Sequence, residues 1–240
     1  VTTRMRAEEG PAETLEQLIL DLSMARGVDE ILATVRRGAR PLLGADGVTF
    51  VLREGRYCRY ADEDAISPLW KGQRFPLETC ISGWAMLNRQ PVAIEDIYAD
   101  DRIPHAAYRP TFVRSLAMMP VRADDPVAAI GAYWARRHRP TDAELHLLRA
   151  IANGAAVAFT NVTLFRSLNH AKEEAERAKA AIILAMGSLA ETRDNDTGNH
   201  LRRTQHYLRA LAEECLARGL FPGELDEARI ELLYKSAPLH

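Results

Sequence analysis

A proline-free stretch from residue 142 to about residue 191 restricts most strongly how this chain can fold. Within it, apolar residues recur in strict alternation of four and three positions, and charges fill the gaps in "KEEAERAK". Such spacing puts one apolar stripe along a long helix, as in a coiled coil. A lone helix cannot bury that stripe. We therefore expect either a parallel homodimer through residues 161–189 or a helix folded back on its own domain. The stripe consists of Leu164, Leu168, Ala171, Ala175, Ala178, Ile182, Ala185 and Leu189.

The region before this helix mixes helical and strand-like patterns. Two segments, 13–26 and 29–43, have apolar residues at helical spacing, and Gly44 follows the second at a typical C-cap position. Strand-like runs come next, with a short helical piece at 81–88 between the second and the third. This order predicts an α/β (α+β) sensor-type domain with a mostly antiparallel sheet. The expected strands are 47–53, 56–60, 91–96, 115–122 and 127–135.

Composition and charge exclude several classes of protein. The net charge of -2 gives no reason to expect a nucleic-acid or anionic-membrane partner. No apolar stretch approaches the ~18 residues that are needed to span a bilayer, and the start "VTTRMRAEEG" has no apolar signal core. The three cysteines are widely spaced, which predicts free thiols. We therefore expect a cytoplasmic protein.

A possible metal site begins in the segment "ETRDNDTGNHLRRT". Asp196 and His200 are four residues apart, so both side chains can face one point from the first turn of a helix. A carboxylate and an imidazole together suit first-row metals such as manganese, iron or zinc. Taken alone, the pair also fits a capped helix start, because Asp is a favoured N-cap residue.

A second helix follows some thirty residues later and ends in "YKSAPLH" at His240. With both segments in this order, residues 180–240 resemble the HD-GYP family of metal-dependent phosphodiesterases. The resemblance implies that His200 and His240 bind a divalent metal, iron or manganese, and that Asp196 takes a place where some members carry a Glu ligand. It also implies cyclic di-GMP as the substrate of the complete protein. Because the sequence stops at the histidine of the His-Asp doublet, we expect this 240-residue chain to be inactive, with weak or no metal.

Residues 14–161 resemble a GAF domain. The resemblance rests on "ISGWAMLNRQPVAIEDI", "DDRIPHAAYRPTFVRSLAMMPV" and "AAIGAYWA". It implies a pocket for an unknown small molecule between the sheet and the loop before the fourth strand, although these loop residues can equally just pack the loop. The pattern of cyclic-mononucleotide-binding GAF domains is absent, because Arg89 follows Asn88. The loop residues expected near the pocket are Tyr98, Ile103, His105, Tyr108 and Phe112.

These patterns predict a GAF sensor at 14–161, a long helix at 142–191 that overlaps its end, and the start of an all-α HD-type domain at 192–240. The leading hypothesis is a signalling protein in which the GAF sensor regulates an HD-GYP phosphodiesterase that hydrolyses cyclic di-GMP. The alternative is a non-catalytic GAF sensor and dimerisation module. A histidine kinase fragment is less favoured, because Leu201 follows His200 where such kinases carry an acidic residue.

Overall fold

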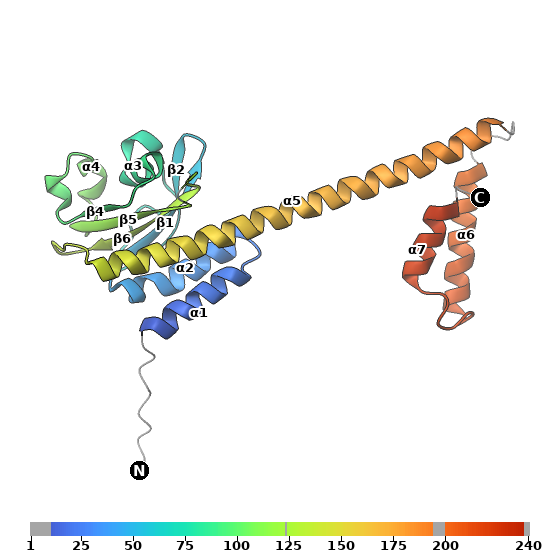
Figure 1. The fold of residues 1–240 in the computed structure, drawn as a ribbon, viewed down its shortest axis with the longest axis horizontal. Helices are drawn as coiled ribbons and strands as arrows, with labels where there is room; N and C mark the ends of the chain where they lie inside the picture. Colours follow the sequence, from blue (N-terminus) through green and yellow to red (C-terminus); the bar gives the residue numbers. More distant parts are fainter. Residues whose placement is uncertain (1–10, 123, 194–199, 238–240) are drawn as a thin grey trace, which may run out of the picture. The chain divides into compact units, whose positions relative to one another are not determined.

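The computed structural model describes residues 11–122, 124–193 and 200–237 (Figure 1). These residues divide into two compact units, with the boundary between Phe165 and Arg166. The first unit contains a six-stranded sheet in the order β3-β2-β1-β6-β5-β4, and every neighbouring pair is antiparallel. The expected α/β fold with a mostly antiparallel sheet is therefore confirmed. The strands are β1 (Gly47–Glu54), β2 (Tyr57–Ala65), β3 (Arg74–Pro76), β4 (Val92–Ile94), β5 (Ser115–Val121) and β6 (Ala128–Trp134).

Helix α2 (Val28–Leu43) and the beginning of α5 (Asp142–Arg193) cover one face of the sheet, which we call the proximal face, and α1 (Pro11–Met24) packs against these two helices (Figure 1). Ile31 and Val35 share one side of α2 and are fully buried there. From α5, Leu148 and Ile151 enter the same core. Helix α2 ends at Gly44, whose φ of 55° lies in the left-handed region that glycine adopts without strain.

Two short helices and two 3-10 turns cover the other face, which we call the distal face: α3 (Ile81–Asn88), α4 (His105–Tyr108), η1 (Leu77–Thr79) and η2 (Ile97–Ala99) (Figure 1). Helix α3 matches its predicted range. It approaches η1 so closely that a Cβ on Gly83 would lie 1.9 Å from the carbonyl oxygen of Leu77. Because both faces are covered, β5 and β6 are buried along nearly their whole length, and β1 is buried over its first five residues.

Strand β2 extends beyond the predicted end at Tyr60 into the polar sequence "ADEDA". Its carboxylates are tolerated because cations lie against them. Asp62 pairs with Arg36 of α2 at 3.1 Å, and Asp64 pairs with Arg40 at 2.7 Å. The acidic run concealed this half of the strand from the sequence pattern. The sequence also did not predict β3 and α4, which are only three and four residues long.

Helix α5 has 52 residues and contains the predicted long helix. Its part Asp142–Ile183 includes an 18-residue window of mean hydropathy 1.3, so the expectation that no segment approaches a membrane-spanning length was too strict. This is weak evidence for a span, because a core helix of a soluble protein passes the same test. One third of that window is indeed buried in the proximal core. Further along, Leu168 and Ile182 of the apolar stripe are 67% and 60% exposed.

The second unit contains the remainder of α5 and a helical hairpin. The hairpin consists of α6 (His200–Ala217) and α7 (Glu227–Ser236). Between them Gly219 and Gly223 adopt φ values of 65° and 78°, which glycine accepts readily. Asp226 then caps α7 by accepting a hydrogen bond from the N–H of Arg229 at 2.7 Å, as expected for a helix that starts at this point.

Candidate functional site

A cluster of four aromatic rings fills the distal face of the GAF-like unit. Trp70, from the loop after β2, lies in its middle. Its ring centroid is 5.4 Å from that of Tyr60, 4.7 Å from that of Tyr108 and 5.6 Å from that of Tyr133. Each of the four side chains is at most 4% exposed. Tyr60 and Tyr133 come together because strands β2 and β6 both flank β1, and alternate residues of a strand point to the same face.

The hydroxyl groups of this cluster differ in their hydrogen bonding. Tyr133 shares a hydrogen bond of 2.9 Å with the Thr49 hydroxyl, and Tyr60 shares one of 3.1 Å with that of Ser82. Among the residues that the structure describes, Tyr108 has the one buried side-chain polar atom without a hydrogen-bond partner. Burial raises the pKa of all three tyrosines, so they remain protonated and can donate hydrogen bonds.

The five loop residues expected near a pocket fall into two groups. Ile103 and Tyr108 are buried in the distal core, and Phe112 is partly buried against it. Tyr98 is 39% exposed, and its ring lies 5.6 Å from that of His105. The Nε2 atom of His105 is 2.9 Å from the carbonyl oxygen of Ile97, a hydrogen bond that holds the loop. A pocket inside the distal face would therefore involve the first group.

Sequence reasoning missed Tyr60, Trp70 and Tyr133 as members of this cluster. The alternating pattern of "GAYW" indicates that Tyr133 and Trp134 face opposite sides of the sheet, but it does not show which side chains they meet. Trp70 belongs to a loop that Glu63 holds in place. The two carboxylate oxygens of Glu63 accept hydrogen bonds from the backbone N–H groups of residues 69, 70 and 71 at 3.0, 2.9 and 2.8 Å.

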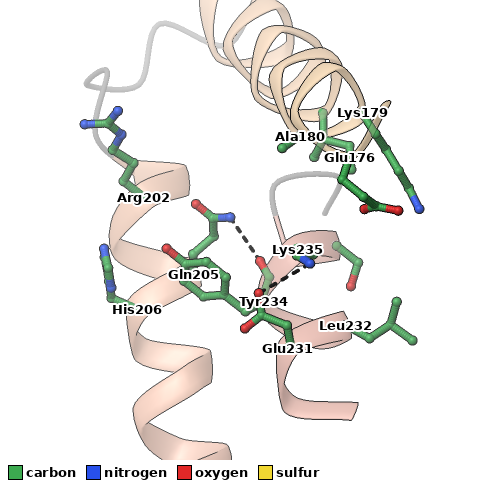
Figure 2. Close-up of a pocket in the computed structure, with 12 residues that line it drawn as sticks. Glu176, Lys179, Ala180, Arg202, Gln205, His206, Glu231, Leu232, Tyr234 and Lys235 are labelled. Carbon is green, nitrogen blue, oxygen red and sulfur yellow. Dashed lines mark hydrogen bonds and ion pairs between the residues drawn. The ribbon is translucent and has the colours of Figure 1, made fainter. Parts of the chain in front are cut away.

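In the second unit, polar contacts fix α6 against α7. The buried side chain of Gln205 donates a hydrogen bond of 3.0 Å to the backbone oxygen of Tyr234 (Figure 2). The guanidinium of Arg209 lies 3.9 Å from the centre of the Tyr234 ring and pairs with Glu231. These contacts join an early turn of α6 to the last turns of α7. The first residues of α6 and the last described residues of α7 therefore lie at the same end of the hairpin.

A pocket of about 550 Å³ lies between this end of the hairpin and the later turns of α5 (Figure 2). Its lining combines apolar groups with charges of both signs, including an ion pair of 3.5 Å between Lys235 and Glu231. Such a lining suits a ligand or chain segment that has both apolar and charged groups. The lining residues are Glu176, Lys179, Ala180, Ile183, Arg202, Gln205, His206, Glu231, Leu232, Tyr234, Lys235 and Ser236.

The predicted metal ligands lie mostly beyond the described residues. Asp196 and His240 are outside them, and His200 is described only as the first residue of α6, without its side chain. Within residues 11–122, 124–193 and 200–237, no group of three or more His, Cys, Asp or Glu side chains could hold a metal ion. The metal site therefore stays a prediction.

The chain is similar to two curated proteins from Vibrio cholerae serotype O1. It is 32% identical over 168 residues to a cyclic di-GMP phosphodiesterase, an alignment that covers 62% of this chain and 34% of that protein. It is 45% identical over 67 residues to a probable cyclic di-GMP phosphodiesterase, covering 28% of this chain and 15% of the relative. The chain thus spans about a third or less of the length of these relatives.

Solved structures with the same fold have low sequence identity to this chain. The GAF domain of an Acinetobacter phosphoenolpyruvate-protein phosphotransferase superposes with a TM-score of 0.56 at 10% identity, over 67% of this chain and 99% of that domain. A free methionine-R-sulfoxide reductase from Neisseria meningitidis superposes with a TM-score of 0.55 at 17% identity, over 68% of this chain and 98% of that protein. At such identities the likeness shows the fold alone.

The family model for the GAF domain matches residues 25–160, more than half of the chain. Together with the Vibrio relatives, this match supports the arrangement expected from the sequence, a GAF domain followed by an HD-GYP-type segment. The antiparallel sheet with helices on both faces agrees with the same assignment. This chain belongs to the GAF domain family.

Proposed function

We propose that this chain carries the sensor and the first part of the catalytic domain of a signalling phosphodiesterase that hydrolyses cyclic di-GMP. The observation that supports it most is the similarity to two Vibrio cholerae proteins named for that activity. Because the alignments cover 34% and 15% of those proteins, the activity and the substrate of the whole protein belong to the proposal. The GAF domain then acts as the sensor that regulates hydrolysis.

In this proposal His200 and His240 hold a divalent metal, iron or manganese, and Asp196 adds a carboxylate. Imidazole nitrogens and a carboxylate oxygen are donor atoms that suit first-row metals. The register of the hairpin supports their convergence, because the start of α6 and the end of α7 lie at one end. A metal held by these residues would supply Lewis-acid chemistry for hydrolysis of a phosphodiester, by activating water and by countering negative charge on the phosphate. Catalytic sites usually need at least three protein ligands and a position for water, so we expect these residues alone to bind metal weakly.

The described residues of the hairpin would position the ligands. Gln205 joins α6 to the backbone of α7, while Arg209 contacts both Tyr234 and Glu231. Metal sites depend on such supporting contacts, since they hold the ligands in the required orientation. The pocket next to the hairpin lies on the same helices, and its lining has more cationic than anionic side chains, Lys179, Arg202 and Lys235 against Glu176 and Glu231, which suits an anionic substrate.

The proposal further assigns α5 the role of a parallel homodimer helix that connects sensor and catalytic segment. Its first turns belong to the GAF core through Leu148 and Ile151. Its later turns expose Leu168 and Ile182 by 67% and 60%, at coiled-coil spacing. A second copy of the same helix would bury this stripe on both chains.

The dimer can be tested by sedimentation at tens of micromolar, a range that detects weak interfaces. We expect a dimer for the unmodified chain and a monomer for Ile182→Glu, because a charge buried in the seam without a partner is costly. Arg166→Glu introduces the same charge on the outer side of the predicted coiled coil and should leave the dimer intact. A monomeric unmodified chain would contradict the proposed dimer.

The phosphodiesterase proposal is tested by assaying cyclic di-GMP hydrolysis with Mn²⁺ or Fe²⁺. We expect no turnover by the 240-residue chain and metal-dependent turnover by a form that carries a complete HD-GYP-type domain. In that form, His200→Ala and His240→Ala should abolish hydrolysis. His170→Ala is the matched control, because His170 is exposed on α5, does not line the pocket and is not a proposed ligand. Robust turnover by the 240-residue chain would refute the site assignment. An inactive longer form would favour the non-catalytic sensor module.

A further inference from the structure

The pocket beside the hairpin takes its lining from three helices (Figure 2). The hairpin helices α6 and α7 contribute most of it, and α5 contributes Glu176, Lys179, Ala180 and Ile183. All of the lining residues belong to the second unit. The pocket volume of about 550 Å³ falls within the ~300–1,000 Å³ that is usual for small-molecule sites. A ligand bound here would therefore touch both the connecting helix and the hairpin.

One of the two anions in the lining is already balanced by cations. The carboxylate of Glu231 is 3.5 Å from the Lys235 ammonium through one oxygen and pairs through the other with Arg209, which lies outside the lining. With Glu231 balanced in this way, three lining cations remain against Glu176. Such a positive excess attracts an anionic ligand.

The three cations lie around the pocket rather than at one point. In Figure 2, Arg202 projects from α6 on one side, Lys179 projects from α5 on the other, and Lys235 lies between them on α7. Within the part of the chain that the structure describes, neither Lys179 nor Arg202 has an ion-pair partner. A single phosphate would meet one of these cations, whereas a ligand with two separate phosphates can meet two.

Aromatic and apolar side chains complete the lining. The ring centroid of His206 lies 5.8 Å from that of Tyr234, and Ala180, Ile183 and Leu232 add apolar groups. Nucleobases stack on aromatic rings of this kind, whatever the base. The pocket thus combines separated cations with ring surfaces, which is the chemistry that recognises a dinucleotide.

We propose that this pocket binds cyclic di-GMP through its phosphates and one base, and that Lys179 of α5 is one of the phosphate contacts. The choice of this dinucleotide rests on the proposed function, whereas the charge and the rings of the pocket do not. Because Lys179 belongs to the helix that begins in the GAF core, the ligand favours the arrangement in which α5 and the hairpin both contact it. Linkage is reciprocal, so a signal from the GAF unit that shifts α5 changes the affinity for the dinucleotide.

Isothermal titration calorimetry of the purified 240-residue chain with cyclic di-GMP tests this site. The buffer contains EDTA, so that no metal at the predicted ligands contributes to binding. We expect an affinity that falls as the salt concentration rises, because salt screens contacts between exposed charges. GMP has one phosphate and inorganic pyrophosphate has no base, so each should bind at least about tenfold more weakly than the dinucleotide.

Lys179→Glu tests the contribution of α5, and Lys172→Glu is its matched control. Lys172 is exposed, lies seven residues earlier at the same position of the coiled-coil repeat, and does not line the pocket. Both variants change the net charge equally and should sediment alike. Arg202→Ala should weaken binding roughly two- to fivefold, the effect of one partly exposed ion pair. Lys179→Glu should weaken it roughly four- to twentyfold, because repulsion replaces attraction, and Lys172→Glu less than about twofold.

Equal effects of Lys179→Glu and Lys172→Glu would overturn the role of α5. An absence of cyclic di-GMP binding, or equal affinity for pyrophosphate, would overturn the site itself. These outcomes are separate from the test of the proposed function. Turnover by the longer form without binding by this chain contradicts only the pocket assignment, and binding by this chain without turnover by the longer form contradicts only the phosphodiesterase.

Discussion

Gly83 lies where α3 packs against η1, and Gly83→Ala tests how tightly the distal face is assembled. A Cβ at this position would lie 1.9 Å from the carbonyl oxygen of Leu77, and 2.6 and 2.7 Å from its carbonyl carbon and Cα. All three atoms belong to the backbone, so no side-chain rotation relieves the contact. Either α3 or η1 must move.

The size of the effect follows from two opposing terms. Overpacking a buried site costs typically ~1–3 kcal/mol, and a backbone obstacle puts Gly83→Ala at the upper end. Alanine in place of glycine in a helix returns about 1 kcal/mol at most. We therefore expect a loss of about 2 kcal/mol in the free energy of unfolding. For a domain of this size class, that lowers the melting temperature by roughly 4–8 °C.

Gly38→Ala in α2 is the matched control. Its Cβ would lie 2.2 Å from the Cδ1 methyl of Leu18, but the next atom is 3.4 Å away, so only the end of one side chain must turn. Replacing glycine by alanine raises the helix propensity here by the same amount as at Gly83. We expect the free energy of unfolding of Gly38→Ala to differ from that of the unmodified chain by less than about 1 kcal/mol.

Tryptophan fluorescence during thermal unfolding reports the stability of the GAF unit in both variants. The three tryptophans, Trp70, Trp84 and Trp134, all lie in the GAF unit, so the second unit does not contribute. Equal shifts in melting temperature for Gly83→Ala and Gly38→Ala would refute the reasoning. A larger shift for Gly38→Ala would refute it as well.

Two further predictions concern polar groups of the distal face. Glu63→Gln replaces one of the two carboxylate oxygens that accept hydrogen bonds from the N–H groups of residues 69–71, so at least one N–H loses its acceptor. The midpoint of urea unfolding should fall by the equivalent of about 1–3 kcal/mol in the free energy of unfolding. An unchanged midpoint would show that the loop does not depend on this carboxylate. Burial raises the pKa of Tyr60, Tyr108 and Tyr133, so their contribution to stability is complete below the unfolded value of about 10 and is lost as the pH rises above it. Absorbance at 295 nm should show these three tyrosines ionising together with alkaline unfolding, and ionisation of all seven tyrosines in a still folded chain would contradict this.

Much of the GAF fold could be predicted, because local patterns determine it. The range of α3 matched, and Gly44 ended α2 as its position after the apolar run indicated. Strands β5 and β6 were recognisable because strands buried on both faces are continuous apolar runs. The second half of β2 was missed because its acidic residues are neutralised by Arg36 and Arg40, which lie on another element.

The candidate sites were less predictable, because they depend on contacts between distant segments. Alternation along a strand tells which face Tyr60 occupies, but the contact with Trp70 depends on the loop that Glu63 holds. In the second unit, the sequence predicted two successive helices, but their antiparallel pairing and its register depend on contacts such as the hydrogen bond between Gln205 and Tyr234.

Strand β6 is the structural element through which the distal face meets the long helix. Tyr133 belongs to the distal cluster, while its neighbour Trp134 is buried in the proximal core together with Leu148 and Ile151 of α5. Only one peptide bond separates the two side chains. Packed cores shift as units rather than absorbing strain locally. A molecule bound against Tyr133 would therefore act on the backbone segment that also carries Trp134, and through Trp134 on the core that contains the first turns of α5.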